Sequence, residues 1–503
     1  MSRADRLALL LSLLGILAAL LVTQFIFEGL PHIEDELAYA WQAKVIARGQ
    51  LTIPSPSHPS SYLVPFVVDY HGQRFGKYPL GWPVLLAVAV RLGLRSWLNP
   101  LLAGLGVWLT YRLGKRLFTE RIGLLAAALT VISPFFLMNS GSLLSHSFGL
   151  VLSAAFTLAW LDAFCDPTAS RKWLPTMVAG LTLGILALTR PLTAVGVALP
   201  FGLHGLHLLL RGNPPTRRRL LALGGLVVLL VSLYPLWQYA VTGDPFLNPY
   251  TLWWKYDTIG FGPEHGWMKG GHTLLHALNN ASQSLWAGCG DLFGWWRLSW
   301  IFLPFGMWAT RHNRRGWLVG GVFLSLVILY LAYWIGAELF GPRYYYEALF
   351  SLTLFSAAGV ALLLGWPLTT GEAPHIFNGR MRYLPRITVL LLVGLVAYNL
   401  IFYLPHRLGD MQGLYGLERA DLRPFLTPQA DKRTPALVIV HAEDWMEYGA
   451  LLELEDPWLT TPFVFAWSIG PKTDETLAGD FPDRAVYHYY PDEPGQFYSS
   501  PRP

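Results

Sequence analysis

Long apolar runs recur along this 503-residue sequence, with short polar stretches between them. A run of about 20 apolar residues can cross the hydrocarbon core of a bilayer as a helix, because a helix satisfies its own backbone hydrogen bonds. The pattern therefore predicts an all-α polytopic membrane protein. We expect eleven spans, at residues 7–27, 98–117, 121–138, 146–165, 174–189, 191–211, 218–240, 291–309, 317–337, 343–366 and 386–404.

The apolar stretch 79–95 (PLGWPVLLAVAVRLGLR) differs from these runs. It is short, has two prolines at its start and carries two arginines, so we expect an interfacial helix that lies on the membrane. Loop charge favours the same interpretation. With eleven spans and an inside N-terminus, the basic stretches PPTRRR and RHNRR fall in cytoplasmic loops, as the positive-inside rule requires. A further span at 79–95 would place both stretches outside.

This topology divides the chain into a transmembrane domain, residues 1–404, and a small extracytoplasmic domain, residues 405–503. The transmembrane domain has two large outer loops, at 28–97 and 241–290. In the last segment, TPALVIVHAEDW, TPFVFAW and DRAVYHYY have the composition of strands, with helical or loop sequence between them. The sequence therefore predicts a small α/β domain at the C-terminus, on the outer side of the membrane.

Composition supports the membrane assignment and narrows the function. The chain is 53% hydrophobic and only 14% charged, which is too little charge to cover a soluble domain. The net charge of +5 does not indicate a nucleic-acid partner, because basic loops beside spans report topology. The first apolar run has no small-residue cleavage site after it and is interpreted as a retained anchor. The two cysteines fall at opposite ends of spans, so no disulfide is expected.

Three consecutive acids stand where the first span ends. The stretch LPHIEDELAYAWQA, residues 30–43, contains Glu34, Asp35 and Glu36 and has helical spacing. Carboxylates in the first turn of a helix complement its dipole, which is one explanation. The other is chemical, since clustered acids in a partly dry site repel one another, and one of them then has a raised pKa and can act as a base.

Three cations are candidates for binding an anion on the outer side: Lys77, Arg190 and Arg343. Lys77 and Arg343 stand at the membrane interface, where they could hold a phosphate or simply snorkel or anchor a helix end. Arg190 lies between two apolar spans with almost no loop around it. An arginine there is costly unless it faces water, an anion or a polar cavity.

Histidines give weaker signals. His146 begins a span and could equally be a packing residue. His272 and His276, in HTLLH, have the i, i+4 spacing of metal ligands. They lack the glutamate of a zincin helix and a recognisable third ligand, so no metal site is expected there.

The order of motifs in the first outer loop is distinctive. An anchor span is followed by Asp35-Glu36-x-x-Tyr39-x-x-x-Ala43, then Gly49-x-Leu51-x-x-Pro54, then Gly76-Lys77-Tyr78-Pro79-Leu80-Gly81-Trp82 and the interfacial helix. This layout resembles the GT-C superfamily of integral-membrane glycosyltransferases over roughly residues 5–410. It is most similar to the branch that contains aminoarabinose transferases and protein O-mannosyltransferases.

The resemblance implies an enzyme that transfers a hexosyl or pentosyl group from a polyprenyl-phosphate donor to a hydroxyl group of a lipid, glycan or protein acceptor. In that family, the acid at the position of Asp35 is the catalytic base, and the lysine at the position of Lys77 binds the lipid phosphate. Glu36 and Glu34 are the second and third candidates for the base, and Arg190 and Arg343 complete the phosphate-binding group. The residues expected to line the cavity or touch substrate are Tyr39, Tyr78, His146 and Tyr345.

Two departures from the family pattern matter. The second outer loop of many relatives carries another acid, and here that region reads SLLSHSF. A Thr-Lys-Gly at the end of a middle span reads Thr189-Arg190-Pro191, which keeps the positive charge. Because the second acid is missing, we expect no metal and no cofactor. The expected reaction is one in-line displacement that inverts the anomeric carbon.

Two other classes remain open from the residues. A transporter or flippase for lipid-linked sugars also needs charges in a membrane cavity, but the sequence lacks the paired halves that are typical of transporters. A non-catalytic membrane scaffold is the other. The expected location is the plasma membrane of a bacterium or archaeon, with the site on the extracytoplasmic face.

Overall fold

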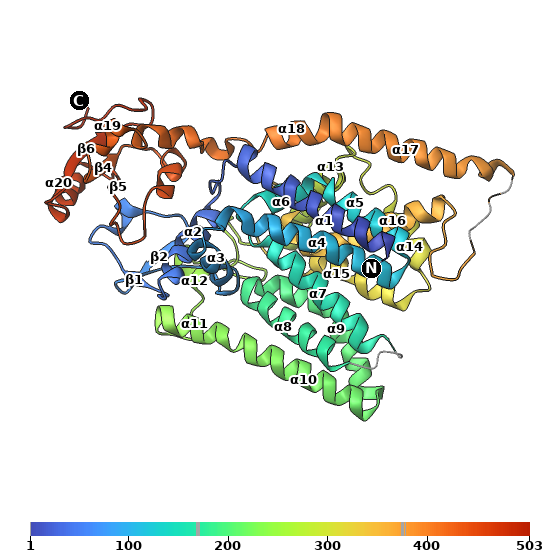
Figure 1. Ribbon diagram of the computed structural model, residues 1–503. Coiled ribbons are helices and arrows are strands. Elements are labelled where there is room, and N and C mark those ends of the chain that lie inside the picture. Colours follow the sequence, from blue (N-terminus) through green and yellow to red (C-terminus); the bar gives the residue numbers. More distant parts are fainter. Residues whose placement is uncertain (1, 167–171, 374–376, 378, 503) are drawn as a thin grey trace.

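The computed structural model describes residues 2–166, 172–373, 377 and 379–502, and it is mostly helical (Figure 1). The central helices run roughly along one direction. Helix α1 (Arg3–Leu21) packs on α4 (Arg95–Leu117) and α5 (Glu120–Val131), and α7 (His146–Phe164) packs on α4 and α8 (Trp173–Thr189). Helix α16 (Leu349–Leu363) is buried on every side and contacts α5 and α14 (Leu303–Thr310).

Further helices surround this centre. They are α9 (Pro191–Arg211), α10 (Pro214–Val231), α11 (Leu233–Thr242), α13 (Leu274–Asp291), α15 (Arg314–Tyr330), α17 (Leu384–Tyr398) and α18 (Leu404–Gly409). In Figure 1, α10 and α11 run along one side of the molecule, and α17 and α18 run along the opposite side. Helices α10, α11 and α17 expose several leucines, and α10 and α17 also expose valines, as expected for surfaces that face lipid.

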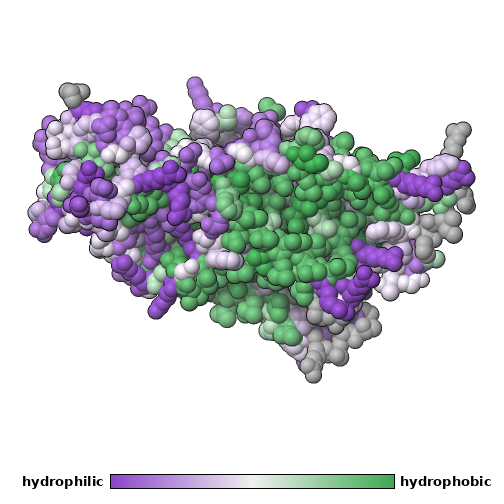
Figure 2. Space-filling model, turned by 45° about the horizontal axis from the view of Figure 1, so that its top comes forward, coloured by the Kyte–Doolittle hydropathy of each residue, from purple (hydrophilic) through white to green (hydrophobic). Residues whose placement is uncertain are grey.

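An apolar belt separates two polar ends on the face shown in Figure 2. Six helical stretches are long and apolar enough to cross a membrane, or seven if one bent pair counts as a span, among the described residues. That criterion supports fewer spans than the eleven predicted. The difference arises partly because the predicted span 121–138 is broken into α5 and α6 (Pro134–Gly141), which meet at 61°. The predicted span 174–189 is helix α8, which has only 17 residues.

The predicted span 291–309 is wrong. Helix α13 ends at Asp291, and the short helix α14 begins only at Leu303. Turns fill the interval, where Gly294 has a φ of +69° and Trp296 has a φ of +52°. Positive φ values interrupt a right-handed helix. Helix α13 itself lies in a segment that the sequence assigned to an outer loop.

The first outer loop positions most of the charged residues. Helix α2 (Glu34–Ala47) follows α1 and its π-helical extension η1 (Val22–Ile26). Strands β1 (Ile53–Pro54), β2 (Val67–Tyr70) and β3 (Gln73–Gly76) form an antiparallel sheet in the order β1-β3-β2. A turn of 3-10 helix, η2 (Pro59–Tyr62), lies between β1 and β2. Helix α3 (Gly81–Arg91) then packs on α2, within the stretch where an interfacial helix was predicted.

Short helical pieces connect the later elements. Helix α12 (Pro249–Trp253) lies in the second large loop, and 3-10 helix η3 (Arg343–Ala348) leads into α16. The 3-10 helix η4 (Gly379–Tyr383) precedes α17, and the π-helix η5 (Asn399–Tyr403) joins α17 to α18.

The C-terminal segment contains three parallel strands, β4 (Ala436–Val440), β5 (Phe463–Trp467) and β6 (Ala485–Tyr489), in the order β5-β4-β6. Each lies within one of the stretches predicted to be strands. Helix α20 (Pro471–Asp480) connects β5 to β6, and α19 (Pro428–Asp431) precedes β4. The remaining turns are the 3-10 helices η6 (Leu414–Gly416), η7 (Arg419–Phe425), η8 (Trp445–Glu447) and η9 (Gly449–Glu453).

Ion pairs and hydrogen bonds join this segment to the first outer loop. The Lys44 ammonium donates to the backbone carbonyl of Glu455 at 2.7 Å, and Arg95 pairs with Glu453 at 2.8 Å. The C-terminal segment therefore lies beside α2 at one end of the molecule, as Figure 1 shows.

Close contact between α4 and α5 depends on two glycines that face each other. A Cβ at Gly114 would lie 2.4 Å from the Cα of Gly123 and 2.9 Å from Cδ2 of Leu354. The backbones could not approach this closely with any side chain at either position.

We expect Gly114→Ala to lower the free energy of unfolding by about 1–3 kcal/mol, because the added methyl group overpacks the α4–α5 contact. Gly224→Ala is the matched control, since that position is also helical and has no atom within 4 Å of a new Cβ. Unfolding of the detergent-purified protein measures both. Equal stability of the two variants would contradict the close contact.

Candidate functional site

A cavity of about 520 Å³ opens among the first outer loop, the α8–α9 junction, the loop before α16 and the C-terminal segment. Its wall combines carboxylates, cations and aromatic rings from segments far apart in sequence. The lining includes Glu34, Asp35, Tyr39, Lys77, Tyr78, Arg190, Asp257, Tyr333, Trp334, Arg343, Tyr344 and Tyr415. The structure thus brings Asp35 and Lys77 to one cavity.

Asp35 is the second residue of α2, a helix whose N-cap, Ile33, provides no side-chain cap. Its Oδ1 accepts a hydrogen bond from the Tyr78 hydroxyl at 2.6 Å. Its Oδ2 lies 3.6 Å from Nη1 of Arg343 and accepts no hydrogen bond from the described part of the chain. One carboxylate oxygen is therefore held in place while the other faces the cavity.

Lys77 follows strand β3 directly and is almost completely buried, with 3% of its side chain exposed. Its ammonium lies 3.4 Å from Oδ2 of Asp257 and 3.4 Å from the ring centroid of Phe66. The rings of Tyr250 and Trp254 are 4.8 and 5.0 Å away. Burial lowers the pKa of Lys77, and Asp257 and Asp35 oppose that shift. Aromatic faces also stabilise the cation.

Asp257 is a site residue that sequence reasoning missed. It is buried and accepts hydrogen bonds from the Tyr333 hydroxyl at 2.9 Å and from the Trp334 indole at 3.2 Å. Asp257 stands 180 residues from Lys77 in an outer loop with no regular pattern. No local signal in the sequence could have paired them.

Arg343 begins η3 and lies at the cavity wall, with 15% of its side chain exposed. Its Nε and Nη1 groups are buried and have no hydrogen-bond partner in the described residues. Guanidinium donors of this kind suit a phosphate or carboxylate ligand, which they can bind in a fork. The Tyr344 ring, 5.7 Å from the guanidinium carbon, forms part of the same wall.

Arg190 is held by a second missed acid, Glu347. Nε of Arg190 lies 3.0 Å from Oε1 of Glu347, a fully buried side chain, and its Nη2 donates to the Tyr330 hydroxyl at 3.3 Å. His146 approaches the same oxygen at 3.3 Å through Nδ1, from behind Arg190. His146 does not line the cavity, so its predicted contact with substrate is replaced by a place in this buried cluster. Glu347, an acid inside an apolar run, was visible in RYYYEALF.

The three acids of the sequence cluster lie in different environments. Glu34 lines the cavity, where burial raises its pKa. Glu36 points away from it and is fully buried, where it accepts hydrogen bonds from the backbone N–H groups of His32 and Leu143. Burial raises the pKa of Glu36 to about 7. Glu36 therefore holds the loop before α7 rather than facing the cavity.

Of the three tyrosines predicted to line the cavity, two do and one does not. The Tyr39 ring packs on Tyr78 at 4.4 Å between centroids, and both line the cavity. Tyr345 does not, because it packs against Phe323 and Tyr330. Its neighbour Tyr344 lines the wall instead, since consecutive residues of a 3-10 helix point in different directions.

His272 and His276 do not come together as ligands. His272 Nε2 lies 2.9 Å from the carbonyl oxygen of Leu331, and its ring stacks on Phe261. Neither residue belongs to a group of three metal-ligating side chains among the described residues.

This arrangement of apolar helices, with a charged cavity at one polar end, is similar in fold to solved glycosyltransferases of the GT-C type. Residues 93–239 match the family model described as dolichyl-phosphate-mannose-protein mannosyltransferase. No curated protein matches the sequence significantly.

Two kinds of solved structure share the fold. ArnT from Cupriavidus metallidurans bound to undecaprenyl phosphate superposes with a TM-score of 0.55 at 16% identity, covering 95% of this chain and 92% of that one. The apo oligosaccharyltransferase of Archaeoglobus fulgidus has a TM-score of 0.51 at 13% identity, covering 88% of this chain and 63% of its own length. At these identities, the shared property is the fold. The residues Asp35, Lys77 and Arg343 lie outside the matched segment 93–239.

We expect Glu347→Gln to destabilise the protein by about 3–5 kcal/mol, because it leaves the largely buried Arg190 guanidinium without its charged partner. Glu264→Gln, at an exposed position in a loop, is the control. Thermal unfolding in detergent compares the two. A melting temperature for Glu347→Gln equal to that of the control would show that Arg190 does not need the carboxylate.

Proposed function

We propose that this protein transfers a sugar from a polyprenyl-phosphate donor to an acceptor hydroxyl group, in the cavity that Asp35 and Lys77 share. The observation that carries the proposal is that the Asp35 carboxylate and the Arg343 guanidinium lie side by side at the cavity wall. Within the part of the chain that the structure describes, Oδ2 of Asp35 accepts no hydrogen bond and lies 3.6 Å from the Arg343 guanidinium, whose Nε and Nη1 also make none. The carboxylate oxygen could act as a base, and the guanidinium could bind a phosphate.

Asp35 is the proposed general base. Its Oδ2 would take the proton from the acceptor hydroxyl as the oxygen attacks the anomeric carbon. The Tyr78 hydrogen bond to Oδ1 at 2.6 Å fixes the carboxylate orientation, so Oδ2 stays available. Glu34 lines the same cavity but has no comparable positioning bond among the described residues, which makes it the weaker candidate. One in-line attack would invert the anomeric centre.

Lys77, Arg190 and Arg343 are the proposed phosphate-binding group. As the sugar–phosphate bond breaks, negative charge grows on the departing phosphate, and fixed cations in a dry site stabilise it. Arg343 contributes donors without partners, and Lys77 contributes a buried charge. In this proposal the cations supply the charge stabilisation, and neither a metal nor another cofactor takes part.

The remaining cavity wall favours a dry reaction. Tyr250, Trp254, Tyr333 and Trp334 form an apolar lining around Lys77 and Asp257, and Tyr415 reaches the cavity from the C-terminal segment. Excluding water protects the donor from hydrolysis. The fold is shared with a structure of ArnT that binds undecaprenyl phosphate, which supports a donor with its lipid tail in the bilayer. We place the cavity on the extracytoplasmic face, because the positive-inside rule puts the basic loops PPTRRR and RHNRR in the cytoplasm.

We expect Asp35→Asn to lower turnover by about 10²–10⁴-fold, because asparagine keeps the shape and the Tyr78 contact but cannot take a proton. The measurement is release of polyprenyl phosphate from a polyprenyl-phosphate sugar by the purified protein. Binding of undecaprenyl phosphate should be retained.

Glu34→Gln is the matched control, since it removes a neighbouring carboxylate from the same cavity wall. It should retain most of the activity. Full turnover by Asp35→Asn, or an equal loss in both variants, would move the base to another residue. Lipid binding without release by the wild-type protein would exclude a transferase.

A second prediction concerns pH. Because burial lowers the pKa of Lys77, its positive charge is present below that pKa and is lost as pH rises through it. We expect the affinity for undecaprenyl phosphate to fall about 10-fold or more at alkaline pH. A change of this size corresponds to the loss of one hydrogen bond to a charged group. The decline should begin at lower pH in Asp257→Asn, since Asp257 raises the Lys77 pKa.

Lys77→Arg supplies the control, because a guanidinium remains charged across this range. Titration of the lipid phosphate is common to all three proteins and cancels in the comparison. Binding curves measured in nanodiscs at several pH values test the idea. Identical pH profiles for the wild-type protein and Lys77→Arg would mean that Lys77 does not bind the phosphate.

A further inference from the structure

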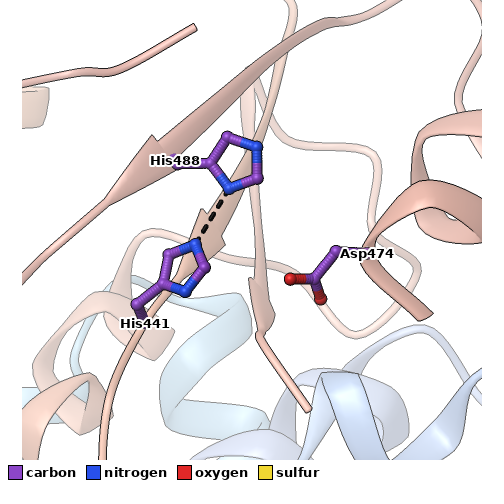
Figure 3. Close-up of side chains that lie close together, drawn as sticks. All are labelled: His441, Asp474 and His488. Atoms are coloured by element: carbon purple, nitrogen blue, oxygen red, sulfur yellow. Dashed lines mark hydrogen bonds between the residues drawn. The ribbon is translucent and has the colours of Figure 1, made fainter. Parts of the chain in front are cut away.

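A second cluster of chemistry-bearing side chains lies in the C-terminal segment, apart from the cavity. His441 follows strand β4, His488 lies near the end of β6, and Asp474 lies in the first turn of α20 (Figure 3). One possible ligand atom from each lies within 4.8 Å of the other two. This is the one such group of three in the described part of the chain. None of the three residues lines the cavity.

The topology explains why these residues meet. Strands β4, β5 and β6 are parallel, so their carboxyl ends share one edge of the sheet. The order β5-β4-β6 means that the chain passes to one side of β4 and then returns to the other side. Ligands of open α/β sheets bind outside the carboxyl edge at such a change of direction, here between β4 and β6. His441 and His488 stand on these two strands.

Hydrogen bonds within the cluster and to Ser468 account for only some of its polar atoms. Nε2 of His441 lies 2.9 Å from Nδ1 of His488 (Figure 3). Oδ2 of Asp474 accepts a hydrogen bond from the Ser468 hydroxyl at 2.7 Å. Oδ1 of Asp474 is buried without a hydrogen-bond partner among the described residues, and the residue is only 6% exposed. Figure 3 shows the carboxylate directed toward the histidine pair. A buried carboxylate oxygen without a partner is costly unless a ligand meets it.

We propose that His441, His488 and Asp474 bind a zinc ion through Nε2, Nδ1 and a carboxylate oxygen. The proposal is independent of the sugar-transfer reaction. Two imidazole nitrogens and one carboxylate oxygen are a common zinc ligand set, and a water would complete a tetrahedron. Imidazole ligands disfavour Mg²⁺ and Ca²⁺, which prefer oxygen.

The spacing of the two histidine nitrogens is close to that of a bound site. Nitrogens bonded to zinc at about 2.0–2.1 Å in a tetrahedron stand about 3.3 Å apart, so the histidine pair needs to open by only a few tenths of an ångström. Ser468 would orient the Asp474 carboxylate as an outer hydrogen-bonding partner. Positive charge nearby is compensated, because Arg502 pairs with Asp492 at 2.6 Å. His441 is partly exposed, which gives the ion an entry path.

The test uses the full chain, purified in detergent, stripped with a chelator and dialysed against zinc alone. The wild-type protein should bind one zinc per chain and show a higher melting temperature with zinc, because the ion binds the folded state. Asp474→Asn should bind at least about tenfold more weakly, and His441→Ala with His488→Ala should lose the site. Excess Mg²⁺ should not compete.

Two controls keep the result interpretable. His276→Ala removes a histidine outside the cluster and should bind like the wild-type protein. Asp474→Asn keeps an amide oxygen for the Ser468 hydrogen bond, so this variant is expected to remain folded. Replacing zinc with Co²⁺ gives a second readout, because the visible absorption spectrum of Co²⁺ is sensitive to tetrahedral coordination. The proposal is overturned if the wild-type protein binds no zinc, or if zinc binding is unchanged in the double histidine variant. Neither result would affect the proposed transferase activity.

Discussion

The buried ammonium of Lys77 imposes the strongest constraint on the outer part of this molecule. A charge with 3% of its side chain exposed needs a partner, and Asp257 provides one at 3.4 Å. That carboxylate needs further donors, which Tyr333 and Trp334 supply. The first outer loop, the second outer loop and the segment that follows α15 are thereby held together around one charge. The aromatic rings that surround Lys77 keep the group dry, so the pair stays strong.

A second buried pair has a parallel role deeper in the bundle. Glu347 has no exposure and joins Arg190 at 3.0 Å and His146 at 3.3 Å. The three residues come from the junction of α8 and α9, from the start of α7 and from η3. The Arg190 guanidinium is therefore fixed at the cavity wall by a carboxylate behind it. Fixed cations are what stabilisation of a departing phosphate requires, since they need no reorganisation during the reaction.

The C-terminal segment contributes to the same end of the molecule. Three of its contacts with the first outer loop, made by Lys44, Arg95 and Arg48, meet the stretch 453–456. Tyr415 extends from it to the cavity wall. The buried carboxyl of Glu455, whose pKa burial raises to about 8, accepts a hydrogen bond from the backbone N–H of Phe465 in β5. The stretch 453–456 therefore contacts both the first outer loop and strand β5, and it links the two.

Local patterns in the sequence were sufficient for the membrane-protein class, for the short helix α3 and for the positions of β4, β5 and β6, because hydrophobic periodicity acts over neighbouring residues. They also singled out Asp35, Lys77, Arg190 and Arg343 as candidate site charges, and all four line one cavity. They failed at 291–309, where turns with positive φ interrupt an apolar run. Only the tertiary structure decided which charges meet. Asp257 joins Lys77 across 180 residues, Glu36 turns away from Asp35 to backbone N–H groups, and His441 meets His488 at a sheet edge. Such pairings depend on how distant segments pack, and the residues near each group along the chain do not encode them.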